Sequence, residues 1–191
     1  FATAVTYATR VDNIDMLDVL SKAGATINTR RLAMTDAVER GSLETVRWLI
    51  GKGARVNGWK HDRKWPLHML VTHRGEAKTI SFEDYKAEMS NPDMTHARYE
   101  REAPRAVDDV TYAAMIEALL IAGAKPDAPW DNGITMLMYG GVVTGKALLT
   151  HGASINARDT GGSTPLHWAR TPEKVELLVA HGADINALAT P

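Results

Sequence analysis

The histidines and the possible nucleophiles are the residues of this 191-residue chain that could support chemistry. The seven histidines include no His-Glu-x-x-His pattern, the spacing at which two helical histidines bind zinc. There is no cysteine, which excludes thiolate ligands, thiol nucleophiles and disulfides. No Gly-x-Ser-x-Gly turn is present to expose a serine nucleophile. The sequence therefore predicts no metal site, no cofactor and no enzyme activity.

A glycine-rich segment formally fits part of a phosphate-binding loop. Gly140 to Lys146 matches the first seven positions of that motif, but Ala147 stands where a magnesium-binding serine or threonine is required. No buried strand precedes the segment, although the motif needs one to position it. We therefore expect no nucleotide site here.

A five-residue pattern, Gly-Ala-x-apolar-Asn, predicts the elements that carry these residues. It begins at Gly24, Gly53, Gly152 and Gly182, and a variant begins at Gly123. The interval is about 30 residues, a length typical of repeat proteins, and one interval is more than twice as long. The pattern predicts a repeated structural unit with a long insertion in the third copy.

An amphipathic segment precedes most of these glycines. Apolar residues at i, i+3 and i+4 lie on one face of a helix, and glycine readily adopts the left-handed conformation that ends one. The predicted apolar faces are Val46, Leu49 and Ile50, then Ile116, Leu119 and Leu120, and finally Val175, Leu178 and Val179.

A second signature marks the start of the first helix in two copies. It reads Thr164-Pro165-Leu166-His167 near the end of the chain and Trp65-Pro66-Leu67-His68 in the middle. Threonine can cap a helix, and proline suits its first position. Residues 156–167 resemble the hairpin and first helix of the ankyrin repeat family almost position for position. In that family the motif histidine, here His68 or His167, bonds to neighbouring backbone.

The resemblance implies an all-α ankyrin-repeat solenoid of about five helix–turn–helix repeats, with short hairpin fingers. We expect a single domain over 1–191, and first helices starting at Thr3, Leu32, Trp65, Thr135 and Thr164. The predicted repeats are about 1–28, 29–57, 58–127, 128–156 and 157–188, with an insertion at about 76–108. The fourth repeat carries Gly140, Gly141 and Gly145 and is expected to be the least stable, because interior glycines weaken helices.

The insertion separates the two helices of the third repeat. We expect one short helix from about Phe82 to Met89, ended by Asn91-Pro92. The insertion either adds a contact surface or covers neighbouring helices. A more distant alternative is an enzyme whose site the insertion builds, drawing on His73, Asp84, Glu88, His96 and Glu102.

Composition limits the class of partner. The formal net charge of −1 does not favour nucleic acid, and no apolar run is long enough to span a membrane. We expect a soluble monomer. The cytoplasm and a bacterial periplasm both remain open, since any signal peptide would lie upstream of Phe1.

The resemblance implies a non-enzymatic module that binds another protein through the concave face and the hairpin fingers. Tryptophan and arginine dominate interface energetics, and the fingers are basic and aromatic, so we expect an acidic or cleft-like partner surface. An alternative is an inhibitor or immunity protein that blocks a bacterial hydrolase or toxin. Trp59 and Trp130 could instead pack finger against finger. The candidate partner-binding residues are Trp59, His61, Arg63, Lys64, Trp65, Trp130, Asp131, Asn132, Met138, Arg158 and Trp168.

Overall fold

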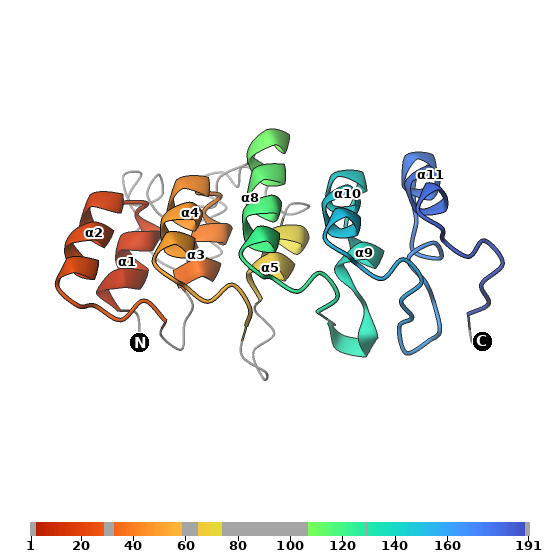
Figure 1. Cartoon of the computed structure of the whole chain (residues 1–191), viewed down its shortest axis with the longest axis horizontal. Helices are drawn as coiled ribbons and strands as arrows, with labels where there is room; N and C mark the ends of the chain where they lie inside the picture. The colour runs from red at the N-terminus through yellow and green to blue at the C-terminus, as the bar shows by residue number, and fades with distance from the viewer. Residues whose placement is uncertain (1–2, 29–32, 59–64, 74–106, 129, 190–191) are drawn as a thin grey trace, which may run out of the picture. The chain divides into compact units, whose positions relative to one another are not determined.

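The computed structural model describes residues 3–28, 33–58, 65–73, 107–128 and 130–189 (Figure 1). The chain forms two compact units, Phe1–Ala118 and Leu119–Pro191, and each is described by itself. Helices are the regular elements of the described residues, which confirms the all-α repeat fold. The expected single domain and repeat boundaries stay predictions.

The helices follow one another in short antiparallel pairs. In the first unit α1 contacts α2, and α3 contacts α1, α4 and α5; in the second, α10 contacts α9 and α11 (Figure 1). The first unit holds α1 (Ala4–Arg10), α2 (Ile14–Lys22), α3 (Ala33–Glu39), α4 (Leu43–Gly51), α5 (Pro66–His73) and most of α8 (Asp109–Ile121). The second holds the 3-10 turn η1 (Asp131–Gly133), α9 (Met136–Tyr139), α10 (Val142–Thr150) and α11 (Pro172–Ala180).

The five Gly-Ala turns share one geometry. Each glycine has a positive φ, from 73° at Gly53 to 92° at Gly123, a conformation that a side chain disfavours. In each turn the alanine N–H donates to the carbonyl five residues earlier, at 2.8 to 3.0 Å. This bond satisfies a helix-end carbonyl that would otherwise lack a partner. The recurring pattern is therefore a recurring helix stop.

The polar residue that ends the pattern links one turn to the next. The Asn28 side chain accepts from the Arg55 N–H at 2.7 Å and donates to the Gly53 carbonyl at 3.2 Å. Asn156 makes the same two bonds, to the Asp184 N–H and the Gly182 carbonyl. A carboxamide can both donate and accept, which explains the recurrence of asparagine. We call these contacts the turn-to-turn hydrogen bonds.

The variant copy replaces that asparagine with Asp127. A carboxylate only accepts, and Asp127 accepts from both the N–H and the hydroxyl of Ser154. The link to the next turn is therefore kept with different donors.

Most of the predicted apolar faces form the core. In the first unit Val46 and Leu49 are fully buried and Ile50 is half-buried, and in the second Leu119 and Leu178 are fully buried. The prediction for α11 was wrong at two positions, because Val175 and Val179 are exposed while Leu177 is buried. The buried face of α11 is thus Lys174, Leu177 and Leu178.

The first helix expected at Thr164 is also different in the structure. Residues 165–168 form turns, with short-range bonds from the His167 N–H to the Thr164 carbonyl and from the Ala169 N–H to the Leu166 carbonyl. Thr171 then caps α11 immediately afterwards. The chain between the two helix starts is too short for a full helix. The expected insertion helix and the start at Leu32 lie outside the described residues.

Candidate functional site

In three repeats the fourth residue of the first-helix motif accepts a hydrogen bond from the backbone N–H of the first, although the three residues differ in chemistry. His167 Nδ1 accepts from the Thr164 N–H at 3.2 Å, as expected from the resemblance. In α9 the Met138 sulfur accepts from the Thr135 N–H at 3.4 Å, and in α1 the Thr6 hydroxyl accepts from the Thr3 N–H at 2.7 Å. Met138 is only 2% exposed. Its role here is structural, although its edge also lines a pocket described below.

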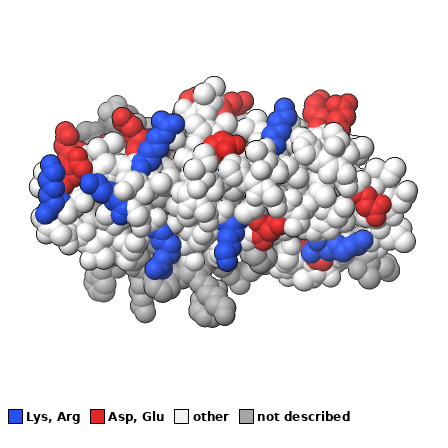
Figure 2. Space-filling model, in the orientation of Figure 1, with Lys and Arg blue, Asp and Glu red and all other residues white. Residues whose placement is uncertain are grey.

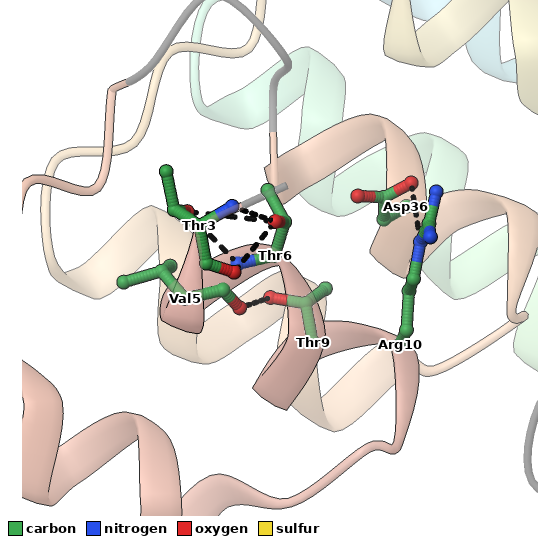
Figure 3. A network of polar contacts seen from close by, with 6 residues as sticks. All are labelled: Thr3, Val5, Thr6, Thr9, Arg10 and Asp36. Atoms are coloured by element: carbon green, nitrogen blue, oxygen red, sulfur yellow. Dashed lines mark hydrogen bonds and ion pairs between the residues drawn. The ribbon is translucent and has the colours of Figure 1, made fainter. Parts of the chain in front are cut away.

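The first unit contains a polar network between repeats (Figure 3). Thr9 on α1 donates to the Val5 carbonyl at 2.9 Å, while Arg10 reaches across to α3. The Arg10 Nε lies 3.5 Å from Asp36 Oδ1, and Asp36 is only 3% exposed. A buried carboxylate is stable only when it is paired. Arg10 of α1 therefore provides the counter-charge for Asp36 of α3.

A second acidic contact joins the same repeats at the turn between α1 and α2. Asp12 adopts φ 54° and accepts hydrogen bonds from the hydroxyls of Ser42 and Thr45. Thr45 is fully buried, so its hydroxyl requires such a partner. Asp12 and Asp36 therefore both make polar contacts within the fold.

The second unit presents two hairpin turns that are bonded to each other. The Trp130 N–H donates to the Ile134 carbonyl at 2.8 Å, and Asp159 and Ser163 form the equivalent pair at 3.0 Å. The Asn132 carbonyl then accepts from the Thr160 N–H at 2.8 Å. These bonds hold neighbouring fingers in one register.

Side chains fix the second finger further. Arg158 donates to the carbonyls of Gly162 and Leu188, at 2.8 and 2.7 Å. The Trp168 Nε1 donates to Asp159 Oδ2 at 3.0 Å, which joins the finger to the turn that replaces the first helix. The arginine therefore stabilises the finger while remaining exposed.

Three aromatic side chains lie along this part of the second unit. Trp130 meets Tyr139 edge to face, with ring centroids 5.5 Å apart. Trp168 borders the same pocket as Tyr139. Trp130 and Trp168 are half-buried, and Tyr139 is 52% exposed. We call Trp130, Tyr139 and Trp168 the aromatic strip.

A pocket of about 290 Å³ opens beside the aromatic strip. Met138, Tyr139 and Trp168 supply its apolar walls, and the backbone of Gly140 and Gly141 supplies one edge. Arg170, Thr171 and Lys174 complete the lining, so the described residues of the pocket include two basic side chains and no acidic one. We call it the Lys174 pocket.

Lys174 is the unusual residue of this pocket. It is 4% exposed, and its Nζ donates to the Gly140 carbonyl at 2.7 Å. Burial lowers the pKa of its ammonium to about 8. A Cβ at Gly145 would lie 3.0 Å from that nitrogen, so the glycine leaves the room that the lysine occupies. Gly145, one of the glycines that resemble a phosphate loop, thus has a packing role.

The candidate residues of the sequence fall into three groups. Trp59, His61, Arg63 and Lys64 lie outside the described residues. Trp65 is half-buried in the first unit, where its ring packs edge to face against His68. The structure places these second-unit candidates on the fingers and beside the pocket: Trp130, Asn132, Met138, Arg158 and Trp168. Asp131 lies in η1, and its side chain is outside the described part of the structure.

Sequence reasoning missed Lys174, although a signal was available. Thr171 followed by Pro172 is typical of a helix start, and Lys174 stands three and four residues before Leu177 and Leu178. That spacing places a lysine on the apolar face of a helix. The choice of Val175 as the start of the face concealed it.

The charges give no sign of a nucleic-acid surface on the face drawn in Figure 2, where separate basic and acidic side chains lie among neutral ones. Within the described residues, no three His, Asp or Glu side chains gather as metal ligands would. No helix in the described part of the chain has the length and apolarity to cross a membrane.

The helix pairs, the left-handed glycine turns and the turn-to-turn hydrogen bonds define a helical-repeat protein. A family model described as ankyrin repeats (3 copies) matches residues 105–189. The same turn geometry recurs at Gly24 and Gly53, outside that match. Residues 105–189 therefore match the ankyrin repeat family, whose members are generally protein–protein interaction modules and typically not enzymes.

The relatives agree with this assignment. The chain is 25% identical to the fowlpox virus ankyrin repeat protein FPV232 over 169 residues, which are 72% of this chain and 35% of the relative. Mouse inversin is 25% identical over 175 residues, 87% of this chain and 13% of inversin. Fowlpox virus FPV233 is 49% identical over 45 residues, 22% of this chain and 9% of the relative. The chain thus spans about a third of FPV232 and less of the other two.

Proposed function

We propose that this chain is a non-enzymatic module that binds a folded protein through its hairpin fingers and first helices. The observation that carries the proposal is the aromatic strip, which lies beside turns held by hydrogen bonds. Large aromatic side chains provide much of the energy of protein interfaces, and they lose little entropy when they are already held in place. Trp130, Tyr139 and Trp168 are partly exposed, and their neighbours fix the turns that carry them.

Trp130 packs edge to face against Tyr139 of α9, whereas the alternative interpretation has Trp130 packing finger against finger. The pair still leaves Tyr139 more than half exposed. The two roles are compatible, since interface anchors are usually held by their own neighbours. Trp59 and Arg63 extend the same proposal to the finger outside the described residues.

The inhibitor hypothesis has no comparable support, because the relatives come from fowlpox virus and mouse and none is named as an inhibitor. An acidic or cleft-like partner surface remains part of the proposal, and the basic residues near the aromatic strip favour it. The monomeric state and the compartment stay predictions from the sequence.

The test is capture of partners by the full immobilised chain, followed by measured affinities for the captured protein. We expect Trp130→Ala and Tyr139→Ala each to weaken binding by about 30-fold, the size of an interface hot spot of roughly 2 kcal/mol. Glu44→Ala, an exposed change on α4, is the matched control. Unchanged affinity in both aromatic variants, with circular dichroism intact, would rule out the aromatic strip.

A further inference from the structure

The Lys174 pocket holds a positive charge that no described side chain balances. Among the described residues, the polar contact of the Lys174 ammonium is with the Gly140 carbonyl. An ammonium has three N–H donors, so two remain for another acceptor. The other polar side chains of the lining are those of Arg170, which adds a second positive charge, and Thr171 and Tyr139, which are neutral.

The fold itself does not require this charge. The Gly140 carbonyl follows α9, and any neutral donor could satisfy it equally well. Burying an ammonium without a counter-charge costs stability, as the lowered pKa of Lys174 indicates. In the first unit, by contrast, the buried Asp36 has Arg10 beside it.

The walls of the pocket indicate what kind of anion fits. Met138, Tyr139 and Trp168 present apolar and aromatic surface, which suits the methylene stem of an amino-acid side chain. The one buried amine, that of Lys174, matches one negative charge, and the second basic side chain, Arg170, is exposed to solvent. A phosphate dianion is better served by clusters of arginines or backbone N–H groups.

We propose that the Lys174 pocket binds the carboxylate of a glutamate or aspartate side chain of the partner protein, with Lys174 as the buried contact and Arg170 at the exposed edge. This inference rests on the proposed function and specifies the partner's chemistry at one position. The aromatic strip would then contact the apolar residues that flank the acidic one.

The test uses the full chain and short synthetic peptides, so that it does not depend on the natural partner. The probe is an acetylated, amidated peptide with one glutamate between leucines, compared with its glutamine and phosphoserine analogues. Binding is followed through the Trp168 indole N–H and the Lys174 Cε signals in NMR spectra. We expect a dissociation constant of about 1 mM, reasonable for so small a contact, and about tenfold weaker binding of the glutamine peptide.

Three variants assign the effect. Lys174→Met should weaken binding of the glutamate peptide by about tenfold or more, and Arg170→Ala by a few-fold. Lys146→Ala removes an exposed lysine from α10 of the same unit and should change nothing. The bound peptide should also raise the pKa of Lys174 above about 8, because a neighbouring carboxylate favours the charged amine. Arg170 is exposed, so its variant keeps the test valid even if Lys174→Met folds poorly.

Equal binding of the glutamate and glutamine peptides, or no binding of either, would overturn the proposal. Tighter binding of the phosphoserine peptide would overturn it in favour of a phosphate site. If the peptide binds as expected while substitutions in the aromatic strip leave partner capture unchanged, the proposed function fails and the pocket stands. If partner capture depends on the aromatic strip but Lys174→Met has no effect on peptide binding, the carboxylate site is refuted and the proposed function stands.

Discussion

The two units of this protein bury charged groups in different ways. In the first, Asp36 is 3% exposed and lies 3.5 Å from the Arg10 guanidinium of the preceding repeat. In the second, Lys174 is 4% exposed and its ammonium contacts a carbonyl oxygen, with no carboxylate in its pocket. Two side chains that are buried to a similar extent therefore differ in charge balance: Asp36 has an oppositely charged neighbour, and Lys174 has a neutral one.

The difference separates stabilising contacts from a candidate binding contact. A buried charge with a partner helps two repeats to stack, although its net contribution is modest. A buried charge without one lowers stability. Residues of the second kind are unusual in a structural position, and they often belong to functional sites. The comparison is thus between a buried charge that has an ionic partner within the fold and one that contacts a neutral carbonyl.

Substitution of Asp12 should have the largest effect on the first unit. Asp12→Ala removes the acceptor of two hydroxyls and places alanine at φ 54°. We expect a loss of about 3 kcal/mol in the free energy of unfolding, from the lost acceptor and the strained backbone. Urea denaturation measures it. Asp12→Gly is the matched variant, because Gly41 adopts φ 70° between α3 and α4, and it should lose about 2 kcal/mol since glycine avoids the strain.

Breaking the charge pair of the first unit comes next. Asp36→Ala should lower the free energy of unfolding by about 2 kcal/mol, because a buried acceptor is removed and Arg10 loses its partner. In an Arg10→Met background the same change should cost about 1 kcal/mol less, as a double-mutant cycle would show. Exposed Asp15 offers the control, and an Asp15→Ala loss as large as that of Asp36→Ala would contradict the argument.

The stability of the second unit should depend on pH through Lys174. The pKa of Lys174 is lowered to about 8 from 10.5, so the unfolded chain binds more protons between those values. The free energy of unfolding should therefore rise with pH across that window, by roughly 1–2 kcal/mol. In Lys174→Met this rise should disappear, and stability at pH 7 should be no lower than that of the wild type within about 1 kcal/mol. Denaturation of both proteins at about pH 7, 8, 9 and 10 would test this, and a parallel rise in the variant would refute it.

The smallest expected effect is shared by the two units. Asn28→Ala and Asn156→Ala each remove a turn-to-turn pair of hydrogen bonds and should cost about 1 kcal/mol. Asn186 occupies the same motif position but makes no side-chain hydrogen bond to another described residue. Asn186→Ala should leave the thermal midpoint unchanged, and a drop equal to that of Asn156→Ala would mean that the bonds are not the cause.

The helix stops were predictable because their cause is local. A glycine followed by alanine can end a helix in one way that satisfies the last carbonyls, and all five turns adopt it. The turn-to-turn role of asparagine was not predicted, because its partners lie in the next repeat. The full helix expected at Thr164 was wrong, since the short chain before Thr171 allows only turns.

The candidate site was only partly predictable for a similar reason. Tryptophans in the fingers could be identified by residue type alone, and Trp130 in the second unit is indeed partly exposed. The space around Lys174 is bordered by Gly145 of α10, a residue distant in the sequence, where a Cβ would lie 3.0 Å from the lysine Nζ. A lysine normally lies at the surface, so composition argues against the position it takes. Such a residue emerges only when the helices are packed against one another.

The turn-to-turn hydrogen bonds also decide where this chain tolerates added length. Those made by Asn28, Asp127 and Asn156 join loops that follow second helices. Residues placed between a first and a second helix, as between α5 and α8, leave these bonds untouched. An affinity tag or a reporter domain is therefore best inserted between His73 and Asp109. The same insertion after Gly53 or Gly152 would separate neighbouring loops and break the turn-to-turn hydrogen bonds.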